Sequence, residues 1–235
     1  IPTAFFMVHG GGWRAGDRTK FTEIAAEFAR RGIITASAGY RLQAQDAFQQ
    51  LADIRQAYDT FAGELERLGR PVQIAVYGES AGAHLASLLA VTPPGGCGEE
   101  YTSTRKWVKP AAMILQSAPH QLAPWEDVSP SIWYTMEEIA GAPYSVDPDR
   151  FHRLSLNRHI SAETPATFFA EAHFEAVFPQ EAIRELAEDM RKLGVPVKLK
   201  RYVQAEHGFF HALDLPIQRE FLEDIVTYLR ELPKR

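Results

Sequence analysis

The chain has 235 residues, 46% of them apolar and 23% charged, which is the composition of an ordinary globular protein. Its formal net charge is −5 and it has no block of Lys or Arg, so nucleic acid is excluded as an expected partner. No apolar run reaches the length of a membrane span, and the single cysteine, Cys97, excludes an internal disulfide. We expect one domain over residues 1–235.

Predicted strands and helices alternate along the whole chain. The pattern of apolar residues predicts strands at 4–8, 33–38, 73–77, 111–116, 165–170 and 197–203, and helices at 19–31, 48–68, 81–91, 180–193 and 217–232. Such alternation is typical of a mostly parallel sheet with helices on both faces, an α/β fold. In this architecture the functional site lies at the carboxyl ends of the strands.

The first motif is the run His9-Gly-Gly-Gly-Trp13, which directly follows the predicted strand at 4–8. Glycine tolerates positive φ, so such a run can turn backbone N–H groups towards a developing negative charge. A flexible loop or a phosphate cradle is the alternative interpretation. The spacing of a phosphate-binding loop, which ends in Gly-Lys-Ser/Thr, is missing here.

The second motif is Gly78-Glu-Ser80-Ala-Gly82, between the apolar run at 71–77 and the helical run at 81–91. A tight turn from strand to helix lifts the hydroxyl of Ser80 clear of the sheet and makes it a candidate nucleophile. Together with the upstream glycine run, it predicts an oxyanion hole made by the backbone amides of Gly11, Gly12 and Ala81.

The segment 117–163 is too long for a plain connector and predicts a small cap, with one amphipathic helix at 131–139. It carries several aromatic residues, including Trp125 and Trp133. These side chains either form a substrate pocket, to which we also assign Trp13, or pack the cap helix against the sheet. Both interpretations are open, and a small cap suits short acyl groups.

Two carboxylates follow the predicted strand at 165–170, and either can supply the acid that orients a catalytic histidine. Glu171 comes at the strand end, whereas Glu175 belongs to the loop beyond it. We favour Glu175 and keep Glu171 as the alternative.

The candidate general base is His207, which follows the predicted strand at 197–203 and precedes the last helix. His84 competes with it, because it lies four residues beyond Ser80 on the same helix face. A base on the nucleophile's own helix would point down, away from the hydroxyl. We therefore expect His84 to pack beneath the site.

These motifs together resemble the α/β-hydrolase superfamily, and within it the HGGG esterases related to hormone-sensitive lipase, most closely the bacterial feruloyl- and acetyl-esterase-like branch. The resemblance extends over essentially the whole chain and includes the segments Gly39–Leu42, Asp53–Ala57, Ile139–Pro143 and Leu154–Ile160. It implies a serine, acid and histidine at Ser80, Glu175 and His207, and an ion pair between Arg41 and Asp53 that holds the oxyanion loop. It also implies one or two strands before residue 1, so N-terminal strands are expected to be missing from the chain.

The resulting hypothesis is a serine esterase that acts on short acyl esters of small alcohols or carbohydrates, with hydroxycinnamoyl esters next, and uses no metal or other cofactor. An amidase or aryl-formamidase is the alternative within catalysis. A non-catalytic small-molecule receptor is the alternative from another class, although such receptors typically lose the histidine. The sequence leaves the localisation open, and a homodimer is a further possibility.

Overall fold

The computed structural model describes residues 3–69, 73–103, 105–126 and 128–233, and within them the predicted α/β fold is confirmed. The expected strand residues Pro71 and Val72 lie outside the described ranges. The strands are β1 (Thr3–Val8), β2 (Thr35–Ala38), β3 (Gln73–Glu79), β4 (Ala112–Gln116), β5 (Ala166–Phe174) and β6 (Val197–Glu206). They form one sheet in the order β2-β1-β3-β4-β5-β6, and all the described neighbours pair in parallel.

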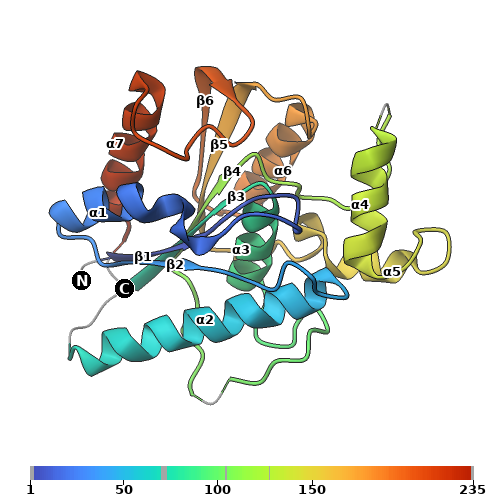
Figure 1. The fold of residues 1–235 in the computed structure, drawn as a ribbon, viewed down its shortest axis with the longest axis horizontal. Coiled ribbons are helices and arrows are strands. Elements are labelled where there is room, and N and C mark those ends of the chain that lie inside the picture. Colours follow the sequence, from blue (N-terminus) through green and yellow to red (C-terminus); the bar gives the residue numbers. More distant parts are fainter. Residues whose placement is uncertain (1–2, 70–72, 104, 127, 234–235) are drawn as a thin grey trace.

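Helices cover both faces of this sheet (Figure 1). They are α1 (Thr22–Arg30), α2 (Ala47–Arg67), α3 (Ala81–Val91), α4 (Pro130–Ala140), α5 (Pro148–Arg153), α6 (Gln180–Lys192) and α7 (Pro216–Glu231), with short 3-10 helices at Arg18–Phe21 and Leu156–Arg158. Helices α1 and α7 pack on one face, and α2, α3 and α6 pack on the other. No helix in the described part of the chain combines the length and apolar composition needed to cross a membrane.

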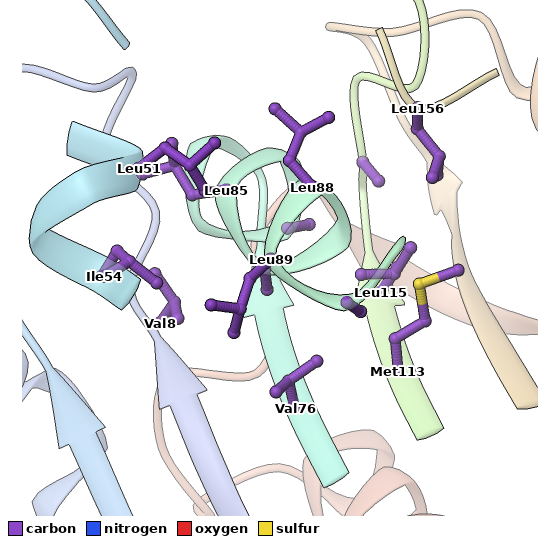
Figure 2. Packing of buried hydrophobic residues seen from close by; sticks show 14 of the residues in the cluster. Val8, Leu51, Ile54, Val76, Leu85, Leu88, Leu89, Met113, Leu115 and Leu156 are labelled. Carbon is purple, nitrogen blue, oxygen red and sulfur yellow. The ribbon is translucent and has the colours of Figure 1, made fainter. Parts of the chain in front are cut away.

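The core is divided between the two faces because side chains alternate along each strand. Along β1, for example, Phe5 and Met7 belong to the cluster under α1 and α7, whereas Phe6 and Val8 belong to the cluster under α2 and α3. Figure 2 shows the second cluster, in which leucines of α3 lie over Val8, Val76 and Met113. Buried on nearly all sides, α3 is a rigid base for the residue that precedes it.

Four predicted elements differ from the structure. Strand β5 continues four residues beyond the predicted end, to Phe174, and β6 continues to Glu206. The helix expected at 19–31 starts as a 3-10 turn, and α1 proper begins at Thr22. The segment between β4 and β5 contains α5 in addition to the one expected helix, which is α4 (Figure 1).

The contact between β1 and α3 requires a glycine at position 82. A Cβ added to Gly82 would lie 2.2 Å from the carbonyl oxygen of Val8 and 2.4 Å from that of His9. We expect Gly82→Ala to lower the free energy of unfolding by about 3 kcal/mol, because backbone atoms must move to admit the methyl group. The measurement is urea denaturation.

Gly63 is the matched control, because it also lies inside a helix, α2, but its added Cβ would be 3.5 Å from its nearest neighbour, the guanidinium of Arg105. Gly63→Ala is expected to raise the free energy of unfolding by roughly 0.5–1 kcal/mol through helix propensity. Similar shifts for the two variants would contradict the steric argument.

Candidate active site

Ser80 occupies the sharp turn between β3 and α3. Its backbone has φ 53° and ψ −122°, a strained conformation for a residue with a side chain. The turn is held by a hydrogen bond of 2.9 Å from the Ser80 amide to the Gln116 carbonyl at the end of β4. Gly78 allows the close approach, since its added Cβ would lie 2.3 Å from the Gly82 carbonyl oxygen. The hydroxyl of Ser80 is thereby presented above the sheet edge.

His207 reaches that hydroxyl from the loop after β6. Its Nε2 lies 2.9 Å from Ser80 Oγ. The following residue, Gly208, has φ 70°, and a Cβ there would lie 2.6 Å from Glu79 Oε1. The glycine beside the histidine therefore lets the loop pass close to the serine turn.

Glu175 lies just beyond the end of β5, with its Oε1 2.7 Å from Nδ1 of His207. The side chain is fully buried, and Oε1 also accepts a hydrogen bond of 2.9 Å from the Val177 amide. Burial alone would raise the pKa of Glu175, but the hydrogen bond and the positive charge of His207 outweigh it and hold the pKa below its usual value. A carboxylate in this position fixes the imidazole tautomer with Nε2 free to accept a proton.

The alternative acid, Glu171, is directed elsewhere. It lies within β5, is 2% exposed and forms an ion pair with Arg184 at 3.0 Å on helix α6. Of the two carboxylates that the sequence left open, Glu175 is therefore the one that contacts His207. The extra length of β5 is the reason, because it carries Glu171 inside the sheet.

The glycine run after β1 forms a tight loop in front of Ser80. Gly11 and Gly12 have φ of 119° and 58°, and the Gly11 carbonyl accepts the amide of Ala15 at 2.9 Å. Among the described residues, the amides of Gly11, Gly12 and Ala81 donate to no other group outside regular elements. The Ala81 amide belongs to the first turn of α3, where N–H groups lack partners within the helix. Free backbone donors beside the nucleophile are what an oxyanion hole requires.

The side chain of Trp13, which the sequence assigned to the substrate pocket, is buried and contacts His84. Its side chain is 3% exposed, and its indole N–H donates to Nδ1 of His84 at 3.1 Å. Nε2 of His84 lies 2.7 Å from the Leu154 carbonyl oxygen. Burial lowers the pKa of His84 to about 4. His84 is therefore neutral and lies beneath the site, as expected. Gln50 of α2 holds the same loop by donating to the Trp13 carbonyl at 2.7 Å.

Two ion pairs flank the turn. Glu79, inside the motif, is buried and pairs with Lys20 at 2.6 Å. Arg41 and Asp53 pair at 2.8 Å, but the Arg41 side chain is 58% exposed and the pair lies at the surface. The connection to the glycine loop runs instead through Gln50, which also donates to the Arg41 carbonyl at 2.9 Å.

The remaining predicted pocket residues have different surroundings. Trp125 lines a small cavity of about 130 Å³ together with Phe178, whose ring lies 5.9 Å from that of His207. Trp133 of α4 stacks instead on Phe151 at 5.7 Å, so it packs the α4–α5 segment together rather than facing that cavity. Phe178 and His120 also line the cavity, but they lie in no motif and could not be singled out from the sequence.

Two other kinds of catalytic site, a metal site and a cysteine nucleophile, can be compared with the described residues. Within the described ranges, no group of three or more His, Cys, Asp or Glu side chains is arranged to hold a metal ion. Cys97 is buried, and burial raises the pKa of its thiol to about 11, so it is not an activated nucleophile.

Comparison with known proteins places this geometry in context. The family model BD-FAE matches residues 2–190. The probable carboxylic ester hydrolase LipM of Mycobacterium tuberculosis is 26% identical over 226 residues, which cover 89% of this chain and 49% of LipM. The chain thus spans about half the length of LipM. The versiconal hemiacetal acetate esterase of Dothistroma septosporum is 24% identical over 96% of this chain and 72% of its own length.

Among solved structures, esterase 2 of Thermogutta terrifontis is similar over nearly the whole fold. The structure phosphonylated by sarin has a TM-score of 0.82 and 26% identity, and covers 99% of this chain and 86% of the esterase chain. The propionate-bound structure has a TM-score of 0.79 and 25% identity, and covers 100% of this chain and 86% of the esterase chain.

Proposed function

From the premise that this chain belongs to the BD-FAE family and has the α/β-hydrolase fold, we propose that it is a serine carboxylic-ester hydrolase. The observation that carries the proposal is the continuous chain of contacts from Ser80 Oγ to His207 at 2.9 Å and from His207 to Glu175 at 2.7 Å. Support comes from the esterase names of the relatives and from the organophosphorus-modified form of the similar esterase.

The reaction follows from this geometry. Ser80 Oγ attacks the ester carbonyl while Nε2 of His207 takes its proton, and Glu175 stabilises the imidazolium that forms. The amides of Gly11, Gly12 and Ala81 donate to the oxyanion of the tetrahedral intermediate. His207 then gives the proton to the leaving alcohol. Water, deprotonated by His207, hydrolyses the acyl-enzyme and releases the acid and the free serine.

The substrate that best fits is an ester with a short acyl group. The cavity beside Trp125 and Phe178 holds about 130 Å³, close to the roughly 150 Å³ of a cavity that accepts benzene. An acetyl to butyryl group fits this space, whereas a hydroxycinnamoyl group exceeds it. Propionate in the similar esterase, and the acetate ester named for the fungal relative, support the same class. The alcohol side is a small alcohol or a carbohydrate.

Hydrolysis of a series of p-nitrophenyl esters from acetate to laurate tests this proposal. We expect kcat/KM to be highest for acetate to butyrate and to fall at least about tenfold by octanoate, because longer chains exceed the cavity. Methyl ferulate and an acetylated xylo-oligosaccharide, assayed alongside, separate hydroxycinnamoyl from acetyl esters.

Two further measurements separate the alternatives. A fluorophosphonate probe should label wild-type Ser80 and leave Ser80→Ala unlabelled. An inert wild-type protein would point to a binding protein instead. Faster turnover of acetanilide than of phenyl acetate would point to an amidase.

A further inference from the structure

His120 is a buried histidine that lines the cavity beside Trp125. It lies on the segment after β4, is 8% exposed and lines the cavity. Among the described residues, its ring nitrogens form no hydrogen bond. Burial lowers its pKa to about 4, so at neutral pH the ring is uncharged and offers one donor and one acceptor.

Among the described residues that line the cavity, no other buried residue has a polar side chain. Apart from the exposed Gln121, the wall is made of Pro, Ala, Trp and Phe side chains, including Ala123, Trp125, Phe178 and Ala182. Buried polar groups are nearly always hydrogen-bonded in proteins. An imidazole at the wall of an otherwise apolar cavity, with no hydrogen-bond partner among the described residues, is therefore available to a polar atom of a ligand.

One wall residue of the cavity contacts two of the candidate catalytic residues. Phe178, on one wall, lies 5.9 Å from the ring of His207, and its amide is 3.4 Å from Glu175 Oε1. The segment that carries His120 leaves β4 at Gln116, whose carbonyl accepts the amide of Ser80. Both walls of the cavity are thus anchored on residues that contact the triad.

The half-closed shape of the cavity favours the acyl side of the ester. The acyl group stays on Ser80 between the two half-reactions, whereas the alcohol must leave and water must enter. The open side of the site lies at Gly11 and Gly12, which are exposed, and at His207, whose side chain is 25% exposed. The half-closed cavity at His120 therefore suits the group that remains bound.

We propose that His120 is a specificity-determining residue that binds a hydroxyl or oxo oxygen on a short acyl chain, so that esters of hydroxy and oxo acids of about four carbons are preferred over plain alkanoyl esters. This inference rests on the proposed esterase function. A neutral imidazole serves both groups, because it donates to an oxo oxygen and both donates to and accepts from a hydroxyl.

The test compares ethyl butyrate, ethyl 3-hydroxybutyrate and ethyl 3-oxobutyrate by pH-stat titration. For the wild type we expect kcat/KM to be about 3- to 10-fold higher for the two polar esters, the range of one net hydrogen bond. In His120→Leu this preference should disappear, because kcat/KM should fall several-fold more for the two polar esters than for ethyl butyrate. His120→Gln, which keeps a donor and an acceptor, should restore part of the preference.

Two controls distinguish this role from a merely structural one. Ala182→Val narrows the same cavity and should lower kcat/KM for all three esters without changing their ratio. The ratio for 2-hydroxyethyl acetate over butyl acetate, which probes the alcohol side, should not change in His120→Leu. If His120→Leu does not fold, product inhibition of the wild type decides, with 3-hydroxybutyrate expected to inhibit about 3- to 10-fold more strongly than butyrate.

The outcomes separate the two proposals. A wild type that hydrolyses the esters without a preference for the polar acyl groups, or one whose preference survives in His120→Leu, overturns the assignment of His120 alone. A change confined to the alcohol-side ratio overturns the acyl assignment of the cavity. A wild type inert towards all the esters overturns the esterase proposal and this inference with it.

Discussion

Ser80→Ala is expected to lower kcat for p-nitrophenyl acetate by about a million-fold, because no other group in the site can take the place of the nucleophile. The fold should survive, since the Ser80 hydroxyl has His207 as its hydrogen-bond partner and the turn is held by backbone contacts. Steady-state hydrolysis and the thermal unfolding midpoint measure the two effects.

Ser87→Ala is the control for this substitution. Ser87 is likewise a buried serine, but it lies within α3, and its hydroxyl donates to the His84 carbonyl. We expect this variant to keep wild-type kcat within a few-fold. Turnover by Ser80→Ala well above the background rate, with the nucleophile gone, would mean that the reaction does not pass through an acyl-enzyme on this residue.

The parts of the site that could be predicted are those coded by local geometry. A glycine on each side of Ser80 and a glycine run after β1 are required by backbone conformation and close approach, so the sequence carries them as motifs. The order of strands and helices is predictable as well, because the spacing of apolar residues in each run matches the repeat of a strand or of a helix. The predicted sites after the strands follow from parallel pairing, which brings all the carboxyl ends to one edge.

The parts that could not be predicted depend on contacts between distant segments. Trp13 was assigned to the substrate pocket, but its indole N–H is hydrogen-bonded to His84, 71 residues away. Trp133 packs against Phe151 of the next helix. His120 belongs to no sequence motif. Its place in the wall of the cavity depends on the fold, which brings it beside the loop after β5. In each case the side chain's role is set by tertiary packing.

The identity of the triad acid is the point at which the structure adds most to the sequence, and a matched pair of variants tests it. Glu175→Gln keeps the size of the side chain but replaces the carboxylate that accepts from His207 at 2.7 Å. The amide can donate to Nδ1 and so stabilise the wrong tautomer, with the proton on Nε2 facing Ser80. We therefore expect kcat to fall about 10,000-fold. Measurement of kcat on p-nitrophenyl acetate, with the unfolding midpoint as a check on folding, is sufficient.

Glu171→Gln is the matched control, since it makes the same chemical change four residues earlier on the same segment. It weakens an ion pair with Arg184, whose side chain is 39% exposed, and an ion pair that reaches the surface contributes about 1 kcal/mol or less. Its kcat should therefore stay within a few-fold of the wild type. The reverse pattern, with activity lost in Glu171→Gln and kept in Glu175→Gln, would assign the acid to Glu171 and require β5 to end earlier in the active enzyme. Equal losses in both variants would instead indicate that the carboxylates act through the packing of β5 against α6.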